Sequence, residues 1–245
     1  MPSTEFSQIH SPWTPERHSA EQRVDSTIDP GHVLEDLFGD AAAGDACDAI
    51  TLEPRAALPA SWPAQYRFAV VRRGYVIRQR SDARGHTTAI DAVGPGGCFP
   101  LERSSGDSSV PSASGGYAVS RALVALCDEP TVANALQHGG ATALQIHELE
   151  SETIMRMERL ADARGRSGTA GKVAALLCVL ADALQPGAGP GHSIPGAFLQ
   201  RDLAGLLSIR HESVCRALRE FSGKDLVERT ADALMIKDRA ALEAV

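Results

Sequence analysis

The sequence lacks any apolar run long enough to cross a membrane. Its longest uncharged apolar stretch, Val173 to Ala181, is far short of the roughly 20 residues that a membrane-spanning helix needs. The first residues, Met1 to Glu5, are polar and lack the charged and apolar blocks of a secretory signal. We therefore expect a cytoplasmic protein with no membrane partner.

Closely spaced metal ligands are also lacking. The five cysteines form no C-x-x-C pair and no Cys/His cluster with the spacing of a zinc or iron–sulfur site; they are Cys47, Cys98, Cys127, Cys178 and Cys215. We therefore expect free thiols in a reducing compartment, and no metal site.

Positive charge is scarce in the chain as a whole. The net charge is −7, whereas proteins that bind nucleic acid usually display a basic surface. Residues 195–224 differ, because their five Arg and Lys residues outnumber three Asp and Glu residues, giving 5 − 3 = +2. The acidic excess therefore lies outside this segment.

The residues that are present predict two structured parts after a polar start. A chain of 245 residues with 43% apolar content can bury two modest cores. Residues 1–30 show no sustained hydrophobic period, which predicts a flexible extension. From Ile50 to Cys127 short apolar runs alternate with turn residues, which predicts antiparallel β structure. Residues 82–85 read as a hairpin turn, and Ser104 to Gly116 as an irregular loop.

A long helix is predicted after the β structure. A proline follows two acidic residues at Asp128 to Thr131, which is typical of a helix start, and Gly139–Gly140 ends that first helix. From Ala141 to Ala163, side chains recur at spacings of three and four in a narrow stripe: Ile146, Leu149, Thr153, Met157 and Leu160. Such a stripe favours a coiled-coil seam with an identical chain. The alternative is a helix that lies on its own domain.

The last fifty residues predict a helix-turn-helix with a wing. Leu199 to Leu207 and His211 to Phe221 read as two short helices joined by the turn Ser208–Arg210. Two short apolar runs then flank a polar turn, Val227–Arg229 and Leu234–Ile236, and predict a β-hairpin.

The stretch from Arg201 to Arg216, RDLAGLLSIRHESVCR, resembles the Crp/Fnr superfamily of transcription regulators, whose recognition helix is written E-[ST]-[VI]-x-R. Further similar stretches are VVRRGYVI at Val70–Ile77 and GKVA at Gly171–Ala174. The resemblance spans about Ile50 to Ile236. It implies an α+β fold made of an antiparallel, jelly-roll-like β-roll, a long dimerisation helix and a C-terminal winged helix-turn-helix. We expect these parts at residues 31–140, 141–165 and 166–245.

The same resemblance implies a function. Such a protein would be a sequence-specific transcription regulator that binds an inverted-repeat operator in double-stranded DNA as a homodimer, with RNA polymerase as a further partner and no catalytic activity of its own.

Two departures from the family pattern matter. Members that bind cyclic nucleotides hold the phosphate with a Gly-Glu pair followed about ten residues later by Arg-Ser or Arg-Thr. Here the corresponding text is Gly97 to Glu102, a Ser- and Gly-rich loop follows it, and Arg103 comes too early. We therefore do not expect cyclic AMP to be a ligand, and the effector stays unidentified or absent. The second departure is His211, which stands where many members have arginine or valine.

The resemblance assigns DNA contacts to the recognition helix. Arg216 would donate to guanine O6 and N7, and Glu212 would accept from a cytosine amino group; the alternative is an i, i+4 ion pair between them. Gln200, Arg210 and Ser213 lie near helix N-termini and would meet phosphates, the alternative being solvated surface. Cys215 either touches a base or packs within the domain.

Three other side chains are weighed as effector ligands. Cys98 and Cys127 are expected to be small core residues rather than sensors. His147, near the start of the long helix, is expected to be solvated.

Two other classes of function compete with the regulator. A cupin-like β-barrel metalloenzyme with a helical assembly tail would need several closely spaced histidines, and His86 stands alone in the β segment. A regulator that binds partner proteins through its tail is the other alternative. DNA binding measured at two salt concentrations distinguishes it from a DNA reader.

Overall fold

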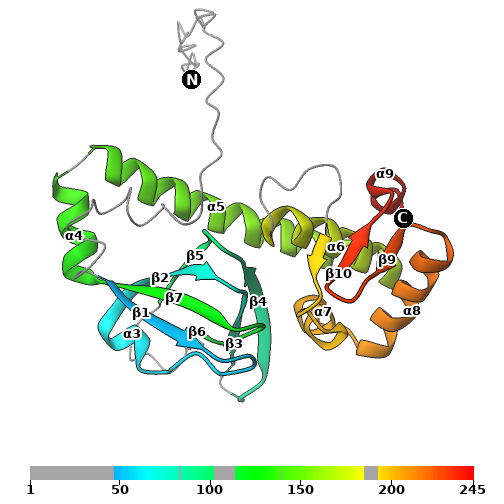
Figure 1. Ribbon diagram of the computed structural model, residues 1–245, viewed down its shortest axis with the longest axis horizontal. Helices are drawn as coiled ribbons and strands as arrows, with labels where there is room; N and C mark the ends of the chain where they lie inside the picture. Colours follow the sequence, from blue (N-terminus) through cyan, green and yellow to red (C-terminus); the bar gives the residue numbers. More distant parts are fainter. Residues whose placement is uncertain (1–46, 83, 102–113, 139, 185–192) are drawn as a thin grey trace, which may run out of the picture.

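The computed structural model describes residues 47–82, 84–101, 114–138, 140–184 and 193–245. The expected N-terminal extension and the loop that holds Glu102 and Arg103 lie outside these ranges. Figure 1 shows a lobe of β-strands and a mainly helical lobe with a small sheet, and one long helix runs along both. The expected α+β fold is confirmed.

The N-terminal lobe is a β-roll made of two antiparallel sheets. One sheet has the order β1-β7-β2-β5, with β1 (Cys47–Leu52), β7 (Ala122–Asp128), β2 (Tyr66–Arg73) and β5 (Cys98–Pro100). The other has the order β4-β3-β6, with β4 (Thr87–Val93), β3 (Val76–Ser81) and β6 (Ser114–Ala118). Alternating apolar side chains fill the space between them, and they include Val71, Val76, Val93, Phe99 and Val124, each fully buried. Burial of these side chains is the main force that stabilises the roll.

The start of β6 corrects the expected extent of the irregular loop. Ser114 to Gly116 were expected in the loop, but they pair with Arg78 to Arg80 of β3. A Cβ atom at Gly116 would lie 2.2 Å from the Ile77 carbonyl oxygen, and its φ is +157°. Only glycine fits there, so the composition that predicted a loop instead permits close strand pairing.

Within the described residues, three helices accompany the roll. The short α3 (Trp62–Gln65) was not predicted from the sequence. Helix α4 (Glu129–His138) begins where expected, because an Asp128 carboxylate oxygen accepts the Thr131 N–H at 2.9 Å and caps the helix. Helix α5 (Gly140–Gly165) is the long helix of Figure 1.

Part of the apolar stripe of α5 packs within its own chain. Ile146 and Leu149 pack against the roll beside Val70 and Cys127, and Leu160 is 2% exposed. Thr153 is buried too, and its hydroxyl donates to the Cys98 carbonyl oxygen at 3.0 Å. Met157 of the same stripe is half-buried and belongs to none of the core clusters of the described residues. The seam with a second chain therefore stays a prediction.

The C-terminal lobe has the predicted winged helix-turn-helix. Its elements are α6 (Thr169–Leu184), β8 (Ser193–Pro195), α7 (Gln200–Leu207), α8 (His211–Gly223), β9 (Val227–Arg229), β10 (Ala233–Ile236) and α9 (Arg239–Glu243). The wing has three strands in the order β8-β10-β9 rather than the two of a simple hairpin. None of the described helices is long and apolar enough to span a membrane.

Candidate DNA interface

Helix α8 presents a polar face to solvent. Its apolar side chains, Val214, Ala217, Leu218 and Phe221, are buried against the rest of the lobe. Spacings of three and four place them on one face, so the side chains between them point outward. Those exposed side chains are His211, Glu212, Arg216, Arg219 and Glu220.

A tight turn fixes α8 on α7. Ser208 ends α7 in the left-handed conformation, at φ 55°, and the Ile209 N–H donates to the Ala204 carbonyl oxygen at 3.0 Å. Leu206 and Val214 are fully buried and belong to one core cluster. The two helices therefore move as a unit, and the orientation of α7 sets that of α8.

The exposed face leaves Arg216 open to a ligand. Glu212 lies 3.3 Å from the His211 ring nitrogen Nδ1, and no ion pair joins Glu212 to Arg216 among the described residues. The i, i+4 pair offered as the alternative role of these two residues is not formed here. A guanidinium on an exposed helix face can donate two parallel hydrogen bonds to a planar acceptor such as guanine.

The other predicted site residues lie around the N-termini of α7 and α8. Arg210 is exposed and precedes α8 with extended backbone, and Ser213 is half-buried one turn later. The Cys215 thiol donates to Gln200 Oε1 at 2.6 Å. Cys215 thus packs between the two helices, and the side-chain amide oxygen of Gln200 points toward α8.

Two exposed arginines near this site were not singled out from the sequence. Arg219 follows Arg216 by three positions on α8, and Arg201 is adjacent to Gln200 on α7. Their helical spacing was the available signal, but a spacing argument cannot show which face is exposed until the packing is known. Arg219 adds positive charge to the exposed face of α8, and Arg201 adds positive charge at the start of α7.

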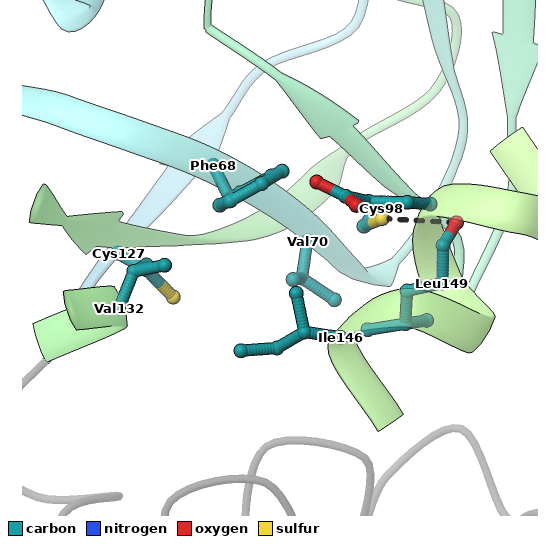
Figure 2. A pocket seen from close by; sticks show the side chains of 8 residues that line it. Phe68, Val70, Cys98, Cys127, Val132, Ile146 and Leu149 are labelled. Carbon is teal, nitrogen blue, oxygen red and sulfur yellow. Dashed lines mark hydrogen bonds between the residues drawn. The ribbon is translucent and has the colours of Figure 1, made fainter. Parts of the chain in front are cut away.

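A small apolar pocket lies between the roll and the helices α4 and α5. Figure 2 shows its lining side chains; they are Phe68, Val70, Cys98, Cys127, Val132, Ile146, Leu149 and Glu150. Burial raises the pKa of the Cys98 thiol, so this sulfur stays protonated and behaves as a small apolar group. His147 is exposed and does not line the pocket.

A buried ion pair attaches α5 to the roll. Arg156 donates from Nε and Nη2 to the two carboxylate oxygens of Asp91, both at 2.8 Å, and Asp91 is fully buried. The hydrogen bonds to Asp91 raise the pKa of Arg156 against the opposing effect of desolvation, which is the largest single influence. Arg78, 2% exposed, lies 3.8 Å from the same carboxylate.

The roll offers no metal-ligand set within the described ranges. No group of three His, Cys, Asp or Glu side chains is arranged to hold a metal ion there. His86 is exposed at the tip of the β3–β4 hairpin, where its ring lies 3.1 Å from the Asp82 carboxylate. It therefore points to solvent rather than into a barrel.

An exposed recognition helix on a winged helix-turn-helix, joined to a β-roll, defines a class: DNA-binding transcription regulators. The family model of the Crp-like helix-turn-helix domain matches residues 171–245. A comparison with curated protein sequences finds no match.

Solved structures share the fold of the described chain. FixK2 from Bradyrhizobium japonicum matches with a TM-score of 0.65 and 19% identity, over 81% of this chain and 96% of that one. A cyclic nucleotide-binding domain containing protein from Listeria monocytogenes EGD-e matches with a TM-score of 0.66 and 14% identity, over 84% and 96% of the two chains. A CooA mutant from Carboxydothermus hydrogenoformans matches with a TM-score of 0.61 and 14% identity, over 81% and 87%. The resemblance to Crp/Fnr regulators is confirmed, for the C-terminal domain by its family model and for the rest as a likeness of fold.

Proposed function

We propose that this chain is a homodimeric transcription regulator that reads an inverted-repeat operator through α8. The observation that carries the proposal is the exposed Glu212 and Arg216 on the second helix of a Crp-like helix-turn-helix. RNA polymerase is the expected partner on the bound promoter, and the effector is unidentified or absent.

The side chains divide into base readers and phosphate binders. Arg216 donates to guanine O6 and N7, and Glu212 accepts from the amino group of a nearby cytosine. His211 and Cys215 flank these readers. Gln200, Arg210 and Ser213 lie near helix N-termini, where the helix dipole and backbone N–H groups favour a phosphate.

Exposed apolar side chains on α4 and α5 supply the dimer contact. Of six large apolar side chains exposed in the described ranges, four lie on these two helices: Leu136, Leu144, Ile154 and Met155, at 47–60% exposure. Leu144 and Met155 lie about half a helical turn from Thr153, on the opposite side of α5, and Ile154 lies between these two sides, about a quarter turn from Thr153. A second copy of α5 would cover them.

Selection from random DNA tests the reading roles. The wild-type protein should enrich an inverted repeat whose half-site centres lie roughly one helical turn, about 34 Å, apart. Arg216→Ala should lose about 1 to 3 kcal/mol per half-site and relax the preference at one G·C pair. Arg210→Ala should lower the affinity for all DNA sequences alike and make that affinity less dependent on salt concentration. An Arg216→Ala protein that keeps the wild-type motif would show that Arg216 does not read a base.

A further inference from the structure

The first helix of the helix-turn-helix is tied to the β-roll through one buried carboxylate. Asp202 on α7 is 2% exposed. Arg55 Nη1 donates to both of its oxygens, at 2.8 and 2.9 Å, and the Tyr117 hydroxyl donates to Oδ1 at 2.7 Å. Arg55 follows β1 and Tyr117 lies in β6, so both belong to the roll. We call Arg55, Tyr117 and Asp202 the latch.

The backbone at Arg55 indicates that its side chain is needed there. Its φ is +69°, in the left-handed region that disfavours residues with a Cβ atom and suits glycine. The strained residue is nevertheless an arginine, and its guanidinium also donates to the Ala197 carbonyl oxygen at 2.8 Å. The guanidinium carbon lies 5.7 Å from the centre of the Tyr117 ring. Both terminal nitrogens of the guanidinium therefore donate to the C-terminal lobe, and the contact with the Tyr117 ring holds the guanidinium from within the roll.

The other end of α7 is tied as well. Arg164, in the last turn of α5, donates from Nε to the Leu206 carbonyl oxygen at 2.7 Å. Its Nη2 donates to the Ala89 carbonyl oxygen of β4 at 2.5 Å. The latch holds the first turn of α7 and Arg164 holds its last turn, so the helix cannot rotate on the roll without breaking one set of bonds.

We propose that the latch sets the spacing between operator half-sites that the protein accepts. This inference rests on the proposed dimeric DNA reader. In a two-fold dimer the separation of the two α8 helices depends on how each α7 sits on its own roll, because α7 and α8 share a core. Glu212 and Arg216 stay exposed while the latch is closed. The latch therefore positions the reading face and does not cover it.

The test combines two substitutions with two matched controls. Arg55→Met and Tyr117→Phe together remove the hydrogen bonds that the roll side chains make to Asp202 and keep the apolar volume. Arg239→Met removes another bidentate arginine–aspartate pair, to Asp182, which lies wholly within the C-terminal lobe. Tyr66→Phe removes another hydroxyl–carboxylate contact, to Asp48, which lies within the roll.

Each protein is titrated against operators whose half-sites are moved apart one base pair at a time. The wild type and both controls should bind the operator with one spacing about tenfold more tightly than the others, because a charge-assisted hydrogen bond typically contributes about this much. In the double variant, the affinities for the best and the other spacings should differ by less than about threefold, because the hydrogen bonds that fix α7 on the roll are gone. Its preference at the base pair read by Arg216 should be unchanged. If the double variant fails to fold, Tyr117→Phe alone should show part of this loss of spacing preference.

Two results would overturn the proposal. One is an unchanged spacing preference in the folded variants, and the other is tighter binding at the best spacing, which would make the latch inhibitory. If the wild type binds none of the operators, the proposed function fails instead. Hydrogen exchange of the free protein then decides the latch: faster exchange at residues 200–207 in the double variant, and not in the controls, supports a held α7, and equal exchange refutes it.

Discussion

At the scale of single residues, the buried ion pair between Asp91 and Arg156 allows a specific prediction about stability. Asp91 is fully buried in the roll and binds both donor nitrogens of Arg156 from α5. A pair of this kind need not stabilise more than a well-packed apolar pair would. Removal of one partner is different, because it leaves the other charge buried without its counter-ion.

Asp91→Ala should therefore destabilise the fold by about 3 to 5 kcal/mol. The matched control is Glu220→Ala, because the carboxylate of Glu220 pairs with Lys224 at 2.6 Å on the exposed side of α8 and solvent-exposed pairs contribute little. Urea unfolding of both variants measures the difference. Equal stability of the two variants would refute the assignment of Asp91 as the structural counter-ion of Arg156.

A second residue-scale expectation concerns alkaline pH. Burial raises the pKa of the Cys178 thiol from 9.0 to about 11. The unfolded chain releases this proton near pH 9, whereas the folded chain retains it, so the thiol's contribution is complete below pH 9 and is lost as pH rises toward 11. Between pH 9 and pH 11, the free energy of unfolding of the wild type should fall by about 1 to 2 kcal/mol because of Cys178.

Cys178→Ala should remove that part of the alkaline slope. The free energy of unfolding, measured from pH 8 to pH 11, gives the comparison. Tyr117 also has a raised pKa, caused first by burial and then by its hydrogen bond to Asp202, so some slope above pH 10 should survive in the variant. A variant with the full wild-type slope from pH 9 to 10 would contradict the role of Cys178.

At the scale of elements, α5 has two faces with different tasks. One face packs on the roll through Ile146, Leu149 and Thr153. The other leaves Ile154 and Met155 about half exposed. A helix with apolar side chains on its outer face needs a partner to cover them.

The double change Ile154→Glu and Met155→Glu should abolish self-association without unfolding the chain, because charges that are easily hydrated at an open surface become costly in an apolar contact. Sedimentation equilibrium should give about twice the 25.9 kDa chain mass for the wild type and about one chain mass for the variant. Arg84→Glu, an exposed charge change at the tip of the β3–β4 hairpin and outside α5, serves as the control and should stay dimeric.

Changes on the inner face should behave differently. Leu149→Ala should lower the free energy of unfolding by about 2 kcal/mol, at the low end for a partly buried leucine, with little effect on association. A monomeric Leu149→Ala protein would place the dimer contact on the wrong face of α5.

At the scale of the whole molecule, the two lobes share one hydrophobic core. A single cluster joins Ile77, Ala89 and Ala92 of the roll to buried side chains of α5, α6, α7 and α8. Any effector that changes DNA binding from the roll must therefore shift this shared packing, and it can do so only by its difference in affinity for two arrangements.

DNA affinity should not change when cyclic AMP is added. The phosphate would need an uncommitted buried cation. Of the described roll-facing arginines, Arg156 is bound to Asp91, Arg78 lies 3.8 Å from the same carboxylate, and Arg164 donates to the Ala89 carbonyl oxygen. Desolvation of an unpaired phosphate would cost several kcal/mol. Isothermal calorimetry of the protein with cyclic AMP, together with a DNA titration in its presence, checks this. Binding in the micromolar range would refute the expectation.

The sequence by itself determined the elements whose signals are local. The recognition helix could be predicted because Val214, Ala217 and Phe221 recur at helical spacing beside a short turn. The start of α4 followed from Asp128, which caps its own helix three residues later. The strands of the roll followed from alternating apolar residues and turns. Each of these signals acts within a few residues, so it can be read without knowledge of the rest of the chain.

Tertiary structure alone decided how those elements meet. The stripe on α5 predicted an apolar face, but a periodic pattern cannot tell a second chain from the chain's own roll, and in the structure Ile146 and Leu149 of that stripe pack on the roll. The strand at Ser114 was hidden by a loop-like composition until its partner β3 was in place. The latch joins Arg55 to Asp202 across 147 positions. Contacts over such separations depend on the packing of the whole chain, and no local pattern in the sequence records them.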